Sequence, residues 1–255
     1  LIVFLPLLGF LYCAFVGSYF HDRVSQLVTT FLLTISTFLS WIIFLQYLEG
    51  ANTTIIHILN WITSGSFSAD WSLRVDALTA TMMVVVTTVS ACVHLYSVGY
   101  MNEDKSINRF MGYLSLFTFF MLMLVSSNNL LQMFFGWEGV GLSSYLLIGF
   151  WHHKDSANKA AIKAFILNRV GDFGFVLGIV GVFFIFGSIN FDIIFTDAIN
   201  YQNHAFNFLG LSLSTIDTLC FLLFIGAMGK SAQLGLHTWL PDAMEGPTPV
   251  SALIH

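Results

Sequence analysis

Long stretches without a charged side chain dominate this sequence. Residues 24–48, 77–102 and 110–137 contain no Asp, Glu, Lys or Arg, and the first 20 residues are also uncharged. Apolar residues make up 56% of the chain and charged residues 9%, so a water-soluble domain of this size could not cover its surface. The sequence therefore predicts an all-α polytopic membrane protein. It excludes a cytosolic enzyme, a basic nucleic-acid-binding domain and a disordered segment.

Seven segments are long enough to span a membrane, because a helix of about 20 apolar residues crosses a hydrocarbon core of roughly 30 Å. The pair Asn128-Asn129 favours a turn, so it divides the run 110–137 into two spans. We expect one membrane domain, with four helices and an outward loop at 49–76 in residues 1–127, and the remaining helices in residues 128–255. The expected spans are 1–20, 24–48, 77–102, 110–127, 130–151, 158–189 and 218–240, and an eighth begins near Pro249.

The basic residues are distributed unequally between the loops. The loops 21–23, 103–109 and 152–163 contain six Lys or Arg, whereas the loops 49–76 and 190–217 contain only Arg74. Since Lys and Arg favour the cytoplasmic or matrix side of a membrane, the first set is expected on that side and the second set outside. The outer loops carry Trp61, Trp71 and Tyr201, which are expected at the membrane interface.

Two charged residues lie deep inside the expected spans, where a charge costs about 2.5–3.5 kcal/mol. Glu138 lies in the sequence GWEGVG at 136–141, and Lys230 lies in GAMGKSAQ at 226–233. The glycines around Glu138 permit close approach of another helix. We interpret both groups as protonatable sites. The alternative is a static ion pair between Lys230 and Glu138 or Asp172.

Other ionisable residues in the spans allow two readings each. Arg169 and Asp172 are three residues apart on one face of the sixth span, so they are expected to pair or to form a proton entry point. His94 is expected to be a hydrogen-bonded core residue. The three cysteines are expected to be buried thiols, and no group of residues has the spacing of a metal or haem site.

The last 20 residues predict an interrupted helix. Pro241 has no N–H and would break the helical bond to the carbonyl of His237, and Gly246 adds backbone freedom. His237, Asp242 and Glu245 surround this break. Broken helices at membrane depth mark ion pathways in transporters, whereas the alternative is an ordinary loop between two spans.

Four of these motifs together resemble the antiporter-like subunits of respiratory complex I, the NADH:ubiquinone oxidoreductase. The resemblance extends from about residue 76 to the end of the chain, while residues 1–75 fit by hydropathy only. Its motifs are GWEGVG at 136–141, NRVGD at 168–172, GKSAQ at 229–233 and HTWLPDAMEGPTPVSALIH at 237–255. The resemblance implies inverted five-helix repeats, a discontinuous seventh helix and a charge-coupled pair formed by Glu138 and Lys230. It also implies that Asp172 and Arg169 contribute, and that His255 continues the pathway.

The resemblance further implies a non-redox, proton-translocating subunit of the mitochondrial inner membrane. Flavin, iron–sulfur clusters and quinone would be bound by partner subunits, and this chain would carry no cofactor apart from bound lipids. Its partners would be other membrane-arm subunits, especially the neighbouring antiporter-like subunit 4. Members of the family are more than twice as long, so a second polypeptide or a longer chain is expected to complete the fold. The alternatives are a subunit of a multisubunit (Mrp-type) cation/proton antiporter and a structural scaffold.

Overall fold

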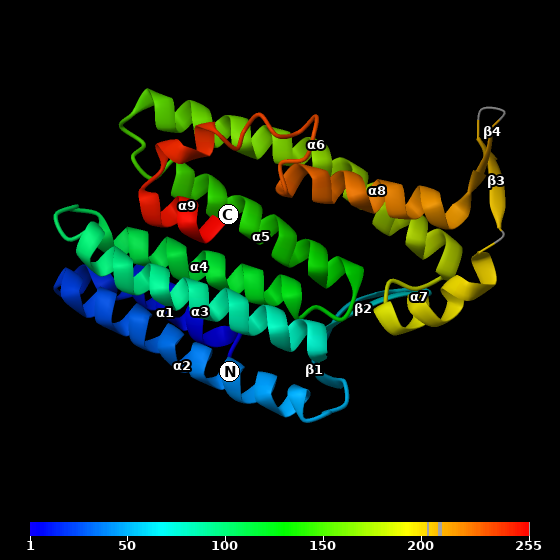
Figure 1. Ribbon diagram of the computed structural model, residues 1–255, viewed down its shortest axis with the longest axis horizontal. Helices are drawn as coiled ribbons and strands as arrows, with labels where there is room; N and C mark the ends of the chain where they lie inside the picture. The colour runs from blue at the N-terminus through cyan, green and yellow to red at the C-terminus, as the bar shows by residue number, and fades with distance from the viewer. Residues whose placement is uncertain (203, 209–210, 255) are drawn as a thin grey trace.

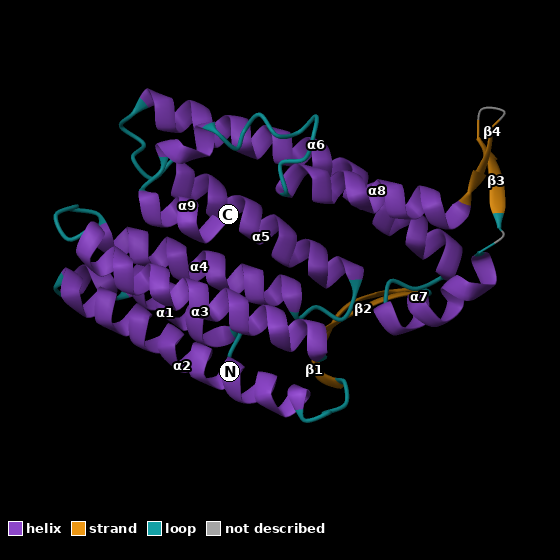
Figure 2. Ribbon diagram, in the orientation of Figure 1, coloured by secondary structure: helices purple, strands orange, loops and turns teal. Residues whose placement is uncertain are grey.

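The protein is mostly helical. The structure, a computed structural model, describes residues 1–202, 204–208 and 211–254. Its longer helices are α1 (Phe4–Phe15), α2 (Asp22–Leu48), α3 (Ala77–Tyr100), α4 (Ile107–Val125), α5 (Leu130–Ile148), α6 (Asp155–Phe186) and α8 (Thr215–Lys230), and two short helices are α7 (Phe191–Asp197) and α9 (Thr248–Ile254) (Figure 2). By length and composition, α2, α3, α4 and α6 are apolar enough to cross a membrane.

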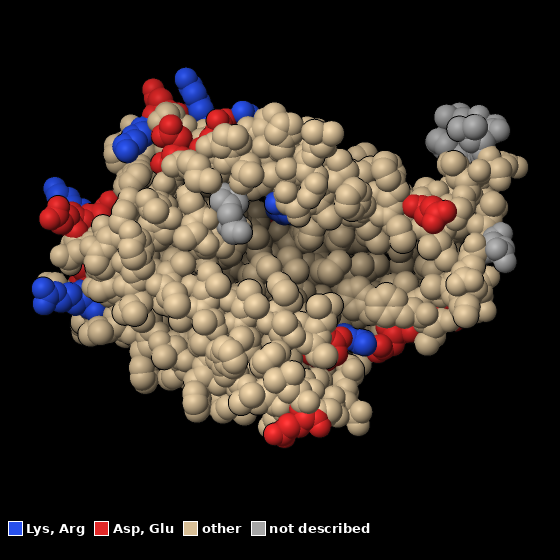
Figure 3. Space-filling view, in the orientation of Figure 1, with Lys and Arg blue, Asp and Glu red and all other residues tan. Residues whose placement is uncertain are grey.

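The helices form two groups joined by α5. Helices α1 to α4 pack into a bundle, α6 packs along α8, and α5 lies between the bundle and this pair (Figure 1). The core between α4 and α5 includes the fully buried Phe110, Leu114 and Leu147. Large apolar side chains cover much of the outside, and charged side chains gather near the ends of the molecule (Figure 3). This distribution suits helices surrounded by lipid.

The predicted helical membrane architecture holds for most of the chain, and two β-hairpins among the described residues add to it. Strands β1 (Thr54–Ser64) and β2 (Phe67–Val75) pair antiparallel, and so do β3 (Ala205–Phe208) and β4 (Leu211–Ser214). Both hairpins lie in segments predicted as loops. The first is rich in β-branched and aromatic residues, and Gly65 makes its turn with φ of +58°, a conformation that few other residues adopt readily.

The first hairpin is fixed to the turn between α4 and α5. The backbone amide of Ser72 donates to the side-chain oxygen of Gln132 at 3.1 Å, and the side-chain amide of Asn129 donates to the carbonyl of Asp70 at 2.7 Å. The amide of Arg74 donates to the carbonyl of Ser126 at 2.8 Å. These bonds satisfy polar groups that packing removes from water.

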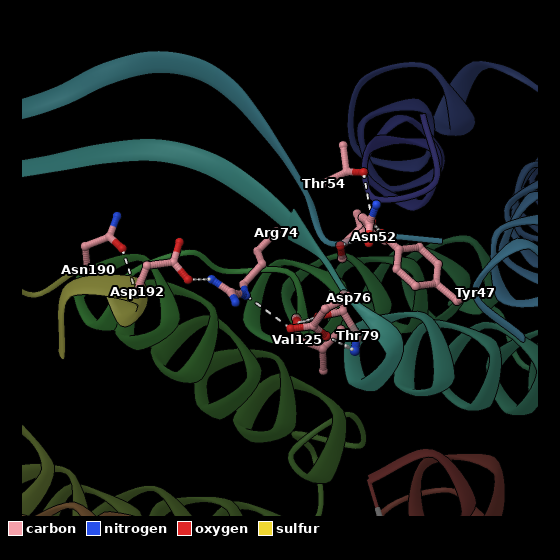
Figure 4. Close-up of polar contacts among 10 residues, drawn as sticks. Tyr47, Asn52, Thr54, Arg74, Asp76, Thr79, Val125, Asn190 and Asp192 are labelled. Atoms are coloured by element: carbon pink, nitrogen blue, oxygen red, sulfur yellow. Dashed lines mark hydrogen bonds and ion pairs between the residues drawn. The ribbon is translucent and has the colours of Figure 1, made fainter. Parts of the chain in front are cut away.

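Arg74 joins three elements at this end of the molecule (Figure 4). Its guanidinium contacts the carboxylates of Asp76 at 3.1 Å and Asp192 at 2.5 Å. The hydrogen bond with Asp192 raises the pKa of Arg74. Burial by itself would raise the pKa of Asp76, but hydrogen bonds from Thr79 and Arg74 stabilise the carboxylate and lower that pKa. Asp76 is also the N-cap of α3, because its Oδ1 accepts from the amide of Thr79 at 2.8 Å.

Helix α8 ends earlier than the predicted span 218–240, so the interruption does not begin at Pro241. The last helical residue is Lys230, and the backbone then bends through Ala232 and Gly235, which have φ of +49° and +99°. The indole N–H of Trp239 donates to the carbonyl of Gly229 at 3.1 Å. The returning segment therefore adds a side-chain donor to a carbonyl of the last helical turn, which also accepts from the amide of Ala232 at 3.4 Å. Pro241 instead precedes a short 3₁₀ turn, Asp242–Glu245.

Candidate functional site

Glycines bring α6 unusually close to α8, and α5 unusually close to α4. A Cβ atom placed on Gly171 of α6 would lie 3.1 Å from the Cα atom of Gly229 on α8, which is closer than most packed Cβ atoms approach another atom. On α5, a Cβ atom on Gly136 would meet the backbone of Leu124. Small residues permit such close helix contacts in membrane proteins. The ion pair between Glu138 of α5 and Arg169 of α6, and the approach of Lys230 of α8 to α5, place the charged residues of these three helices around one region.

Glu138 of α5 forms an ion pair with Arg169 of α6. The other carboxylate oxygen, Oε1, is buried and has no hydrogen-bond partner among the described residues. The Arg169 guanidinium also lies over the ring of Phe165, 4.6 Å from its centroid. The structure therefore gives Glu138 one cationic partner and leaves one oxygen able to accept another proton or hydrogen bond.

The predicted pair between Arg169 and Asp172 is absent from the described ion pairs. The Asp172 side chain points into the protein, and the residue is 4% exposed, whereas the Arg169 side chain is 44% exposed. Asp172 instead accepts a hydrogen bond of 2.6 Å from the indole N–H of Trp137. The indole is held in place because it stacks on Phe175 with the two rings 4° from parallel.

Lys230 is the last residue of α8, and its amine points toward α5. The amine lies against Gly141, where a Cβ atom would overlap it. Glu138 and Gly141 are three residues apart, so they share a face of α5. Among the residues that the structure describes, no carboxylate oxygen forms an ion pair with Lys230, although Asp172 and Glu138 both attract its charge. The reading of a static pair with either carboxylate is therefore wrong for this structure.

The Lys230 side chain lines a cavity of about 430 Å³. Figure 3 shows the corresponding hollow between α8 and the bundle, with a basic group at its edge. Most of its wall is apolar and comes from α3, α4, α5 and α9. Its polar lining includes Thr118, Ser144, Asn168 and Ser231. None of these four residues was among the predicted site residues.

The residues of the predicted helix break lie away from Glu138. Asp242 forms an ion pair of 2.7 Å with Lys163, and Glu245 accepts from the hydroxyl of Ser156 at 3.1 Å. Gly246 packs against the backbone of Ile148. Lys163 precedes Asp172 by nine residues, or about 13 Å along the helix. Asp242, Glu245 and Gly246, together with the adjacent Pro241, therefore attach the segment after α8 to the beginning of α6 and the end of α5.

One predicted pathway histidine lies apart from the cavity in the described structure. His237 is exposed and does not line it. His255 lies outside the described residues. Cys13 is buried as expected, whereas Cys92 and Cys220 are exposed on the apolar surface, so the prediction of three buried thiols is wrong for these two.

The prediction for His94 is confirmed, since its ring is fully buried and hydrogen-bonded. Nδ1 lies 2.9 Å from the carbonyl oxygen of Ser90, and Nε2 lies 3.1 Å from the hydroxyl of Ser115. The hydroxyl of Ser90 lies 2.5 Å from that of Thr118. The sequence analysis missed these hydroxyl partners. The four-residue spacing of Ser90 and His94 was a signal that both lie on one helix face.

Residues 127–255 match the profile described as "NADH:quinone oxidoreductase/Mrp antiporter, TM". Residues 61–111 match "NADH-Ubiquinone oxidoreductase (complex I), chain 5 N-terminus". The chain therefore belongs to the family of NADH:quinone oxidoreductase and Mrp antiporter membrane subunits, and its resemblance within that family is to complex I chain 5.

Curated relatives carry the same description. The chain is 57% identical to NADH-quinone oxidoreductase subunit L of Rhodobacter capsulatus and 54% identical to NADH-ubiquinone oxidoreductase chain 5 of Arabidopsis thaliana. Both matches cover 100% of this chain, but only 36% and 38% of the two relatives. The chain thus spans little more than a third of their length.

A solved structure has the same fold. The Mrp complex from Dietzia sp. DQ12-45-1b matches 100% of this chain and 26% of its own chain with a TM-score of 0.79. The two sequences are 20% identical, so this likeness shows the antiporter-like fold alone.

Proposed function

We propose that this chain is the N-terminal part of the antiporter-like subunit 5 of complex I and forms its first proton half-channel. The observation that carries the proposal is the position of Lys230. Its amine projects into a cavity and lies against Gly141 of α5. Glu138, which is on the same face of α5 as Gly141, is paired with Arg169. An amine that has no ion-pair partner among the described residues, close to a carboxylate that is paired with another cation, is suited to bind and release a proton.

The proposed step is a competition for Glu138. When Arg169 holds the carboxylate, the attraction between Glu138 and the Lys230 ammonium is weaker, which favours release of the proton. When Arg169 withdraws, Glu138 stabilises the ammonium. Two opposite charges 4 Å apart at an effective dielectric constant of about 20 interact by about 4 kcal/mol. Such a change would alter proton occupancy about a thousandfold, because each 1.4 kcal/mol is tenfold.

The wider architecture belongs to the same proposal. Helices α1 to α6 and α8 would be the seven spans, and α8 with the bent segment after it would be the discontinuous seventh helix. Residues 1–127 would be the peripheral helices and residues 128–255 the half-channel. A second polypeptide or a longer chain would supply the second repeat. His255 would continue the proton pathway.

The setting is proposed from the relatives. The basic loops 21–23, 103–109 and 152–163 would face the mitochondrial matrix, and the hairpins would face the intermembrane space. The chain itself would be a non-redox subunit, while partner subunits would bind flavin, iron–sulfur clusters and quinone. The neighbouring antiporter-like subunit 4 would contact it, and lipids would cover its apolar surface.

Substitution of Lys230 tests the proposal. The full-length chain carrying Lys230→Ala would be assembled in the complex, reconstituted in vesicles and supplied with NADH and quinone. We expect fewer protons moved per quinone reduced, with assembly retained. Lys163→Ala is the control, because that cation is paired with Asp242 near the beginning of α6. An unchanged proton-to-quinone ratio in Lys230→Ala would contradict the proposal.

A second candidate is a subunit of an Mrp-type cation/proton antiporter. The matching profile covers both kinds of protein, and the solved Mrp complex has the same fold. Sodium/proton exchange that needs no quinone would favour this candidate. A purely structural scaffold would instead retain proton transport after Glu138→Gln and Lys230→Gln.

A further inference from the structure

A second polar cluster lies between α3 and α4, on the opposite side of the cavity from α6. It consists of Ser90 and His94 of α3 and Ser115 and Thr118 of α4. All four are buried, with exposed fractions of 2% or less. Burying this many polar groups in a helical bundle is costly unless they bond to one another. Here the four side chains contact one another in one row, in the order Ser115, His94, Ser90 and Thr118, and we call this row the file.

The hydrogen bonds define the protonation of the His94 ring. A carbonyl oxygen can only accept, so the 2.9 Å contact between Nδ1 and the carbonyl of Ser90 requires a hydrogen on Nδ1. In the neutral ring, Nε2 is then an acceptor, and the hydroxyl of Ser115 donates to it at 3.1 Å. One side of the ring therefore accepts a proton while the other side can donate one, as a proton shuttle requires.

The file continues from His94 to the cavity. Nδ1 also lies 3.5 Å from the hydroxyl of Ser90, which lies 2.5 Å from the hydroxyl of Thr118. Thr118 donates to the carbonyl of Leu114 at 2.9 Å, so the Ser90 hydroxyl donates to Thr118. Thr118 and Lys230 line the same cavity. The Ser90 hydroxyl is thus already oriented from His94 toward Thr118, and the Thr118 hydroxyl must turn from the Leu114 carbonyl to face the cavity.

The opposite end of the file faces α1 and α2. A Cβ atom on Gly9 would lie 3.3 Å from the Ser115 hydroxyl and 3.5 Å from the methyl of Thr29, so both side chains flank this glycine. The neighbouring Gln26 and Thr30 line another cavity, of about 490 Å³, at the end of the bundle that carries Arg23. The hydroxyl of Thr30 is buried there without a hydrogen-bond partner among the described residues.

We propose that His94, Ser90 and Thr118 relay protons from the α1–α2 side of the bundle to the cavity that contains Lys230. The relay rests on the proposed function, for which it would be an input branch. A proton arriving beside Ser115 bonds to Nε2, and the Nδ1–H bond breaks as its proton passes to the Ser90 oxygen. The Ser90 proton passes to the Thr118 oxygen, and the Thr118 hydroxyl turns from the Leu114 carbonyl and gives its proton to a water molecule in the cavity. That water gives one of its other protons to the neutral amine of Lys230. Each relay group keeps its number of hydrogens, and rotation of the hydroxyls and a tautomer change of the ring reset the file.

The test removes single hydroxyls from the full-length chain in the assembled, reconstituted complex. Thr118→Val preserves the shape of the side chain, and Ser90→Ala removes one oxygen. We expect each to lower the number of protons moved per quinone reduced as far as Lys230→Ala does. Thr118→Ser keeps the hydroxyl and loses the methyl, so it should restore the number of protons moved per quinone reduced. The matched controls are Thr87→Val and Ser97→Ala, whose buried hydroxyls bond, within the described part of the chain, only to carbonyls of α3.

The outcomes separate the relay from the proposed function. If Lys230→Ala lowers the ratio while Thr118→Val and Ser90→Ala do not, the relay is wrong and the function of Lys230 stands. If Lys230→Ala has no effect, the proposed function fails. If the control substitutions lower the ratio as much as Thr118→Val, or if Thr118→Ser does not restore it, the hydroxyls act through packing and the relay is overturned.

Discussion

The helices α1 to α4 and the helices α5, α6 and α8 handle buried polarity in different ways. In the first group, many buried hydroxyls bond to a carbonyl one turn earlier in their own helix; examples are Thr29, Ser40, Thr87, Ser97 and Thr118. In the second group, full charges depend on groups from another helix, as Glu138 depends on Arg169. A hydroxyl can thus make its hydrogen bond within one helix before the helices pack. A buried charge can be paired only when two helices pack at a defined distance and rotation.

The largest expected effect is at the contact that sets this approach. Gly171→Leu would place a side chain against the backbone of α8 near Gly229, which cannot rotate away. We expect destabilisation by about 3 kcal/mol, the upper end for overpacking, and separation of α8 from α6. The measurement is the thermal stability of the detergent-solubilised complex.

Gly99 in α3 is the matched position for that substitution. A Cβ atom there has no neighbour within 4 Å, so Gly99→Leu should change the stability little. Equal losses at the two positions would mean that the second group is no more sensitive to helix approach than the first.

A smaller effect is expected when the charge pair is broken. Arg169→Met leaves the Glu138 carboxylate without its cation, and the half-exposed guanidinium limits the loss to about 1–2 kcal/mol. Adding Glu138→Gln should recover part of this loss, because the double variant has no unpaired charge. Lys163→Met, which breaks an exposed pair, should cost less than about 0.5 kcal/mol. Strict additivity of Arg169→Met and Glu138→Gln would show that the pair contributes nothing.

The smallest effect concerns pH at the α3 N-cap. Because the pKa of Asp76 is lowered by folding, its carboxylate stabilises the fold above the unfolded pKa of about 3.9, and this contribution is lost as the pH falls through the lower folded value. Below about pH 4 we therefore expect faster amide exchange in β2 and the first turn of α3, after correction for the intrinsic rate. The N-cap of α5 is Asn129, whose amide side chain does not titrate, and the first turn of α5 carries no acidic residue, so that turn is the internal control. Equal acceleration at both caps would contradict the assignment, and Asp76→Asn should remove the difference.

Much of the helical architecture was predictable because apolar runs without charge have few other solutions. The predicted spans 24–48, 77–102 and 110–127 correspond to α2, α3 and α4 within a few residues. The first span was predicted too long, since α1 ends at Phe15. The hairpin β1–β2 was missed because its segment contains polar residues and lies between two spans. The run of β-branched residues from Thr54 and the glycine at its turn were the available signals.

The candidate site was predictable in its members but not in its pairs. Glu138 and Lys230 are conspicuous because charges in apolar runs are expensive. The partner of Arg169 depends on how α5 and α6 are rotated about their axes, and glycine contacts in three dimensions decide this rotation. Sequence spacing favoured Asp172, which lies three residues away, but the buried side of α6 directs that carboxylate to Trp137. Likewise, nothing in the spacing along one helix shows that Ser90 meets Thr118.

The left-handed backbone of Ala232 makes elongation of α8 easier than unwinding of its last turn. A residue with a Cβ atom loses roughly 1–2 kcal/mol in this conformation, and Ala232 has φ of +49° only two residues beyond Lys230. Winding one more turn onto α8 would return Ala232 to the right-handed region and recover that energy, whereas unwinding the helix would not. The conformation of Ala232 therefore favours elongation of α8 past Lys230 over unwinding of the helix. Elongation would reorient the peptide groups nearest to the amine.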